Sequence, residues 1–157
     1  MGVDPGTRYA GIGVVDLEGS TFQFVDGTRV SLGTGEIAGR LASLQDEVEG
    51  AIAKFSPELL VIESGYVGPS ARSALRLGEA RGVVLAAAWR AGLRVVEVAP
   101  ATAKRAVTGN GQAGKAQVAA MVGAMLDLPE EVVGSDDVTD ALALAVAGAP
   151  NPLEAMR

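Results

Sequence analysis

The sequence predicts an α/β fold in which a mixed central sheet carries helices on both of its faces. Three observations support this prediction. Short extended segments separated by turns fill residues 3–25. A helical stripe of apolar residues then spans 37–55. Beyond it, extended runs at 59–63 and 94–98 alternate with helical segments, which is typical of βαβ units with parallel strands. An antiparallel beginning followed by parallel strands makes the sheet mixed.

The beginning of the chain contains the predicted antiparallel part. Residues 11–16 and 21–25 are expected to form a hairpin whose turn lies at 18–20. Asp4 ends a preceding strand, and only three residues come before it. A first strand of usual length would therefore need residues upstream of the first methionine.

The helices are predicted from the spacing of apolar residues. In the first helix these recur at spacings of four, three, four, four and three, through Ile37, Leu41, Leu44, Val48, Ile52 and Phe55. Pro57 ends this helix, and the apolar run 59–62 forms a buried strand that leads into Glu63. Further helices are expected at 70–91 with Gly92 as C-cap, at 101–107, at 115–126 and at 137–147. Residues 1–157 are expected to form one domain.

The composition limits the chemistry and the location. Cysteine and histidine are both absent, so disulfides, thiolate metal sites and imidazole ligands are excluded. A metal site must then use oxygen ligands, which favours Mg²⁺ or Mn²⁺. The N-terminal residues do not have the pattern of a signal peptide, and no apolar run approaches the ~18 residues of a membrane helix. The expected location is the cytoplasm.

The net charge of −6 is unevenly distributed along the chain. Residues 72–115 contain eight basic and two acidic residues, and acidic segments lie on both sides. The basic residues are Arg72, Arg76, Arg81, Arg90, Arg94, Lys104, Arg105 and Lys115. This segment predicts a phosphate-binding face. The alternative is that these side chains cover ordinary solvated helix surfaces.

Carboxylates end two predicted strands and open the last predicted helix. Asp4 and Glu63 end strands, and Asp137 and Asp140 lie three residues apart on one helix face. Since ligand sites in open α/β sheets gather at the carboxyl ends of strands, these four side chains are expected to converge. Close carboxylates repel one another, and cations relieve that repulsion. Two Mg²⁺ ions can activate a water and stabilise the leaving oxygen of a phosphodiester.

Some of these carboxylates also have a structural interpretation. Asp4 precedes Pro-Gly and can form a turn. Asp136 and Asp137 can act as helix N-cap residues, and this role is assigned to Asp136. Glu63 follows four apolar residues, and Asp140 borders an alanine- and leucine-rich segment. Burying either charge without a partner is costly, which favours a functional role for both.

Five blocks of the sequence resemble the RuvC-type Holliday junction resolvases, in the order of that family. They are residues 2–7 with 11–15, residues 61–63, residues 73–83, residues 100–118, and Asp137-Val138-Thr139-Asp140-Ala141-Leu142-Ala143. Together they extend over almost the whole chain. The resemblance implies a ribonuclease-H-like fold and a homodimer that makes paired, symmetric nicks in four-way junction DNA during recombination and repair.

The resemblance also implies roles for individual residues. Metal binding and catalysis fall on four carboxylates: Asp4, Glu63, Asp137 and Asp140. They are expected to hold two Mg²⁺ ions, for which Mn²⁺ can substitute. Lys104 and Lys115 match basic residues of the family's site, and we expect them to bind phosphate and stabilise developing negative charge during catalysis. Further DNA contacts are expected from Arg72, Arg76 and Arg105. A branch-migration motor is a partner that the family implies.

Two further features match the family in part. Tyr66 lies in a glycine-flanked loop where the family usually has phenylalanine, which implies stacking on an unpaired base; the alternative is packing against the next helix. Ala74, Gly78 and Gly82 recur every four residues in the helix that resembles the family's dimerisation region. They allow close approach of a second copy or of the chain's own sheet.

Other protein classes remain as alternatives. Asp4-Pro5-Gly6-Thr7 also resembles the first phosphate loop of sugar kinases and actin-like ATPases, but those need two such domains and a second glycine-rich loop, which this sequence lacks. A non-catalytic junction binder and a related nuclease of the same fold are the remaining alternatives. The acidic net charge departs from a DNA-binding protein and predicts steeply salt-dependent binding.

Overall fold

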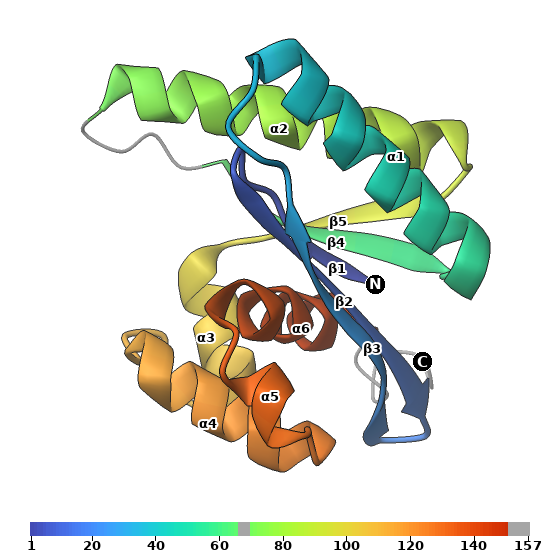
Figure 1. Ribbon diagram of the computed structural model, residues 1–157. Coiled ribbons are helices and arrows are strands. Elements are labelled where there is room, and N and C mark those ends of the chain that lie inside the picture. The colour runs from blue at the N-terminus through green and yellow to red at the C-terminus, as the bar shows by residue number, and fades with distance from the viewer. Residues whose placement is uncertain (66–69, 151–157) are drawn as a thin grey trace.

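The computed structural model describes residues 1–65 and 70–150. These residues form a five-stranded sheet with helices on both faces, which confirms the predicted arrangement (Figure 1). In chain order the elements are β1 (Gly2–Asp4), β2 (Tyr9–Glu18), β3 (Thr21–Ser31), α1 (Ile37–Phe55), β4 (Leu59–Glu63), α2 (Ala71–Arg90), β5 (Arg94–Val98), α3 (Pro100–Thr108), α4 (Lys115–Leu126), α5 (Glu130–Val133) and α6 (Asp136–Gly148). Within those ranges no helix is long and apolar enough to cross a membrane.

The sheet is mixed, in the strand order β3-β2-β1-β4-β5. β2 is antiparallel to both β1 and β3, whereas β4 is parallel to both β1 and β5. The predicted antiparallel beginning and parallel remainder are therefore confirmed. Because β1 and β4 are parallel neighbours, their carboxyl ends lie at the same edge of the sheet.

The structure differs from the sequence predictions at several element boundaries. The hairpin is longer than expected, since β2 begins at Tyr9 and β3 continues to Ser31 with pairing along both strands. The helix α5 was not predicted, because four residues are too few to show a helical period. Asp136 is not the N-cap of α6: Ser135 takes that position, and Asp136 is the first helical residue.

The two helices of the layer formed by α1 and α2 both end at or next to a residue in the left-handed backbone region. The C-cap of α1 is Ser56 with φ 46°, directly before Pro57. The C-cap of α2 is Ala91, so the predicted glycine cap is wrong by one residue. Gly92 follows that cap with φ 72°, a conformation that glycine adopts without steric cost.

The helices form two layers around the sheet. α1 and α2 cover one face, and α3 to α6 lie on the other (Figure 1). The core under α1 and α2 contains the fully buried Val3, Leu44 and Leu60. On the opposite face α6 is the central helix, and its residues from Val138 to Val146 are buried except for Asp140. The two carboxylates of interest on α6 therefore lie at the beginning of a core helix.

The helix α6 lies directly on the backbone of β1 and β2. A Cβ atom on Gly2 would collide with the backbone of Ala141, and a Cβ on Gly11 would collide with the carbonyl oxygen of Asp137. A Cβ on Gly13 would collide with Leu142. These glycines are needed because only hydrogen atoms fit between the sheet and the helix at these points.

Replacing Gly11 with alanine tests this close approach. The added methyl group must push α6 off the sheet, and we expect Gly11→Ala to lower the free energy of unfolding by roughly 1–3 kcal/mol, as overpacked cores do. Urea denaturation measures the change. Gly50→Ala is the matched control, since an added Cβ there meets no described atom within 4 Å. That exposed position in α1 is expected to gain roughly 0.5–1 kcal/mol. Equal effects at both positions would contradict the packing argument.

Candidate active site

Two of the predicted carboxylates lie side by side at one edge of the sheet. Asp4 is the last residue of β1 and Glu63 is the last residue of β4. Val3 is paired with Ile62 in the parallel register, so the next residues along the two strands are Asp4 and Glu63. The sequence prediction that strand ends bring these side chains together agrees with this register.

The other two carboxylates reach this edge through α6. Asp4 is paired with Gly11 across β1 and β2, and the backbone of Asp137 lies against Gly11. The first turn of α6 therefore begins beside the end of β1. Asp140 follows one turn later and lines the same cavity as Asp4 and Glu63.

This cavity has a volume of about 330 Å³ and combines acidic with basic groups. Its charged lining residues are Asp4, Glu63, Lys104, Lys115 and Asp140. Lys104 comes from α3 and Lys115 opens α4, so separate helices bring the two lysines to the carboxylates. Asp137 is not among the lining residues, since its side chain is turned toward β3.

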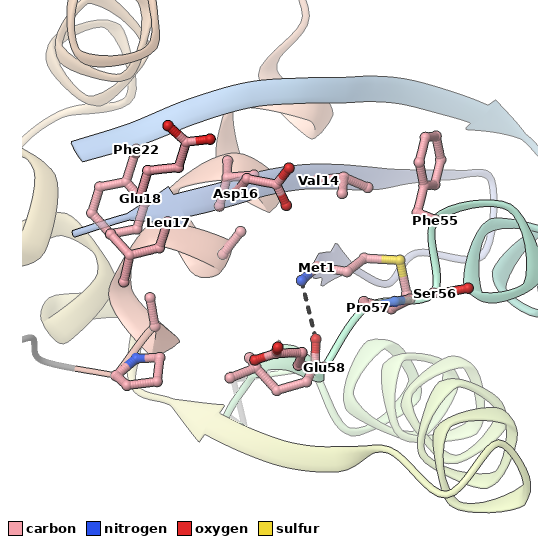
Figure 2. Close-up of a pocket in the computed structure, with 15 residues that line it drawn as sticks. Met1, Val14, Asp16, Leu17, Glu18, Phe22, Phe55, Ser56, Pro57 and Glu58 are labelled. Atoms are coloured by element: carbon pink, nitrogen blue, oxygen red, sulfur yellow. Dashed lines mark hydrogen bonds between the residues drawn. The ribbon is translucent and has the colours of Figure 1, made fainter. Parts of the chain in front are cut away.

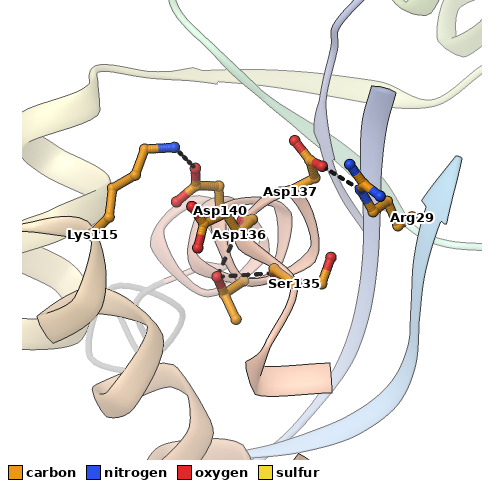
Figure 3. A network of polar contacts seen from close by, with 7 residues as sticks. Arg29, Lys115, Ser135, Asp136, Asp137 and Asp140 are labelled. Atoms are coloured by element: carbon orange, nitrogen blue, oxygen red, sulfur yellow. Dashed lines mark hydrogen bonds and ion pairs between the residues drawn. The ribbon is translucent and has the colours of Figure 1, made fainter. Parts of the chain in front are cut away.

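The two carboxylates of α6 have different cationic partners. Asp137 Oδ2 accepts a hydrogen bond of 2.7 Å from Arg29 Nε, and Asp140 Oδ2 accepts one of 3.2 Å from Lys115 Nζ (Figure 3). Figure 3 shows the two side chains pointing to opposite sides of the helix end. The charge of Asp140 raises the pKa of Lys115, which keeps that lysine protonated.

Burial and like charge act together on Asp4. Burial, together with the negative charges of Asp140, Glu63 and Asp137, raises the pKa of Asp4 to about 7. Burial also raises the pKa of Glu63, helped by Asp140 and opposed by Lys104, Arg81 and Lys115. The site therefore has an excess of negative charge that its own lysines relieve only in part.

The carboxylates are suited to a metal ion but do not form a finished ligand shell. Among residues 1–65 and 70–150, no three acidic side chains lie close enough together to hold an ion as they stand. The two carboxylates of α6 are instead paired with Arg29 and Lys115, at 2.7 and 3.2 Å. The donor set nevertheless fits a hard divalent cation, because every donor is a carboxylate oxygen. Asp140, Glu63 and Asp137 also place negative charge around the half-buried Asp4.

Two arginines near the carboxylates were not assigned to the site from the sequence. Arg29 on β3 bonds Asp137, from which it is separated by 108 residues. Arg81 on α2 donates to the backbone carbonyl of Glu63 and pairs with Glu97 at 2.7 Å. No short motif indicates either contact, because each depends on how distant elements pack.

The predicted DNA-binding residues lie in different places. Arg72 and Arg76 line a second cavity of about 650 Å³ together with Thr7 and Arg8, which lie between β1 and β2. Arg76 is also paired with Glu79 at 2.7 Å. Arg105 is exposed on α3, next to Lys104 in sequence. Tyr66 lies outside the described residues.

A further cavity of about 450 Å³ lies at the opposite end of β1 (Figure 2). Its walls include Met1, Val14, Phe22 and Phe55, and the amino group of Met1 donates to the carbonyl oxygen of Leu59. It lies at the beginning of β1, whereas Asp4 is at the end of that strand. The cavity is therefore separate from the carboxylate site.

Comparison with known proteins identifies the family. The sequence model described as "Crossover junction endodeoxyribonuclease RuvC" matches residues 1–148. The chain belongs to this family. Proteins of that name from Pelobacter propionicus and Xanthobacter autotrophicus are 41% and 43% identical to it, over 93% and 95% of the chain and 82% and 88% of the relatives. The structure of T. thermophilus RuvC in complex with Holliday junction substrate superimposes with a TM-score of 0.85 at 32% identity, covering 93% of this chain and 89% of that one.

The family decides several of the sequence predictions. The ribonuclease-H-like fold is confirmed, and so is the activity of an endonuclease that resolves Holliday junctions. Nucleases of this family depend on metal ions. The sugar-kinase and actin-like alternatives are excluded by the same match.

The raised pKa of Asp4 predicts how stability depends on pH in EDTA. Folded Asp4 keeps its proton up to about pH 7, whereas unfolded Asp4 loses it near the ordinary value of 3.8. Unfolding then releases a proton, so stability is expected to fall as the pH rises from about 4 to about 7. This group contributes on the order of 4 kcal/mol at most. Urea denaturation of wild type and Asp4→Asn across this range measures it; an identical slope for the variant would contradict the assignment.

Proposed function

We propose that Asp4, Glu63, Asp137 and Asp140 bind two Mg²⁺ ions, replaceable by Mn²⁺, and hydrolyse the phosphodiester backbone of four-way junction DNA. The observation that supports this most directly is the half-buried Asp4, whose pKa is raised by burial and then by three neighbouring carboxylates. A divalent cation removes the cost of holding these charges together. Residues 1–157 act as one nuclease domain in this proposal.

The residues of the cavity have different roles in the proposed reaction. Bound metal ions supply an activated water and stabilise the leaving oxygen. Asp4, Glu63, Asp137 and Asp140 would hold those ions at the cavity. Lys104 and Lys115 line the same cavity on its α3 and α4 side, where their ammonium groups can bind the phosphate and offset its developing negative charge.

The DNA-binding surface in this proposal extends from the cavity along two basic groups. One is the second cavity, where Arg72 and Arg76 lie close to the segment that follows Asp4. The other is the exposed Arg105 on α3. Both supply phosphate contacts without base recognition. Tyr66 adds stacking on an unpaired base at the crossover.

We infer that α2 binds a second copy of this chain. Leu75 and Trp89 are 63% and 82% exposed, although both are large and apolar. Gly78 and Gly82 lie between them on the exposed side, and an added Cβ at either meets no described atom within 4 Å. These glycines therefore do not pack on the chain's own sheet. A homodimer through this stripe covers the apolar side chains and provides one nuclease site for each strand that is nicked.

The remaining partners follow from the proposed reaction. Junction resolution takes place where the DNA is, in the cytoplasm of a bacterial cell. A branch-migration motor complex acts on the same junction and brings it to the nuclease. The proposed chemistry of the isolated site does not require the motor complex.

Nicking of a synthetic four-way junction tests the proposed chemistry. Wild type is expected to make paired nicks in Mg²⁺ and in Mn²⁺ and none in EDTA. Asp140→Asn is expected to lower the rate by about 100-fold or more, because several kcal/mol of charge stabilisation is lost with the ligand. Asp46→Asn is the matched control, since it removes the same charge from the exposed surface of α1.

Two outcomes of this experiment count against the proposal. Junction binding by wild type without nicking in either metal would support the non-catalytic alternative. Equal loss of nicking in Asp46→Asn and Asp140→Asn would mean that net charge, and not the site, limits the reaction.

Sedimentation velocity tests the proposed homodimer. Leu75→Asp places a charge in the apolar stripe of α2 and is expected to convert the protein to a monomer, because an unpaired charge in an interface is costly. Met121→Asp is the control, since Met121 is an exposed apolar residue of α4, at 41%. A wild type that sediments as a monomer, or a Leu75→Asp variant that remains a dimer, would contradict this use of α2.

A further inference from the structure

Arg29 makes a bond to Asp137 that engages one carboxylate oxygen. The donor is Nε, the acceptor is Oδ2, and their separation is 2.7 Å. The side chains are 48% and 31% exposed, so neither is part of the core. In Figure 3 the second oxygen of Asp137 is turned away from the guanidinium. The bond thus fixes the direction of the carboxylate and leaves one oxygen for another partner.

Tyr9 fixes the guanidinium in turn. The Cζ atom of Arg29 lies 3.7 Å from the centroid of the Tyr9 ring. Gly11 is the residue paired with Arg29, and Tyr9 is paired with Ser31, so Tyr9 and Arg29 are diagonal neighbours on one face of the hairpin. An isolated exposed ion pair is usually mobile and weak, but stacking on an aromatic ring restricts the arginine to one orientation.

The position of this pair follows from the packing of α6. On the face of the hairpin that meets α6, Gly11, Gly13 and Gly27 have no side chains. On the same face, Tyr9 lies two residues before Gly11 in β2, and Arg29 lies two residues after Gly27 in β3. Arg29 therefore borders the first turn of α6, where its side chain bonds Asp137.

We propose that Arg29, held by Tyr9, is a positioning residue for Asp137. It fixes the carboxylate so that the second oxygen is available to a divalent cation held together with the other acidic residues. Hydrogen bonds to the ligands of a metal commonly have this effect, and removing them costs about 10–100-fold in metal affinity. The inference rests on the proposed function only in taking Asp137 as a metal ligand.

The direction of the change in Mn²⁺ affinity distinguishes a positioning role of Arg29 from a purely electrostatic one. Arg29 is a cation beside a cation site, so a purely electrostatic role predicts tighter metal binding after its removal. Positioning predicts the opposite. Mn²⁺ binding to the full-length protein without DNA, followed by the electron paramagnetic resonance of free Mn²⁺, measures the affinity directly and does not depend on activity.

Four variants make the test specific. Arg29→Ala is expected to weaken Mn²⁺ binding about 10-fold or more, and Tyr9→Leu to weaken it in the same direction by less. Arg29→Gln keeps a hydrogen-bond donor without the charge and is expected to retain part of the affinity. Arg90→Ala is the matched control, because Arg90 pairs with Glu49 at 3.8 Å on the helical layer formed by α1 and α2. Its affinity is expected to equal that of wild type.

A double-mutant cycle shows whether Arg29 acts through Asp137. In the Asp137→Asn background, Arg29→Ala is expected to cause no further loss. Unchanged or tighter Mn²⁺ binding by Arg29→Ala, or full additivity with Asp137→Asn, would overturn the positioning role. If Asp137→Asn itself leaves Mn²⁺ binding unchanged, the assignment of Asp137 as a ligand fails, which is a separate result from failure of the Arg29 contact alone.

Discussion

The close packing of α6 against the middle of the sheet is the constraint on which the site depends. Gly2, Gly11 and Gly13 have no side chains, and the helix above them contributes Ala141 and Ala145. Because the glycines have no side chains and the alanines have small ones, the helix backbone approaches the strands more closely than larger side chains would permit. Because the helix begins above the end of β1, its first turn brings acidic side chains to the strand ends.

This packing has an electrostatic cost. The cavity places Asp140 beside Asp4 and Glu63 in a partly buried region. Burial first, and then the neighbouring negative charges, raise the pKa of Asp4. The cations Arg29 and Lys115 relieve part of this repulsion from outside the cluster of carboxylates. In the proposed function, a divalent cation bound here would recover the free energy that the fold loses by gathering these charges.

The sequence predicts those parts of the site that depend on local patterns alone. An apolar run ending in Glu63 and a short strand ending in Asp4 predict neighbouring carboxylates, because parallel strands share an edge. The contact between Arg29 and Asp137 cannot be predicted in this way. It depends on the hairpin register that pairs Arg29 with Gly11 and on the placement of α6 over that glycine. The helix α5 was missed because its four residues are too few to show a helical period.

The helix α2 connects the proposed dimer contact with the carboxylate site. Its buried side, with Ala80 and Val84, packs on the sheet, while the apolar stripe faces outward. From the same helix Arg81 bonds the carbonyl of Glu63 and the carboxylate of Glu97, and so joins the ends of β4 and β5 to α2. Two copies associated through the stripe would therefore hold their Glu63 residues at a separation determined by one rigid helix in each copy. Paired cuts at a symmetric junction require a fixed separation of this kind.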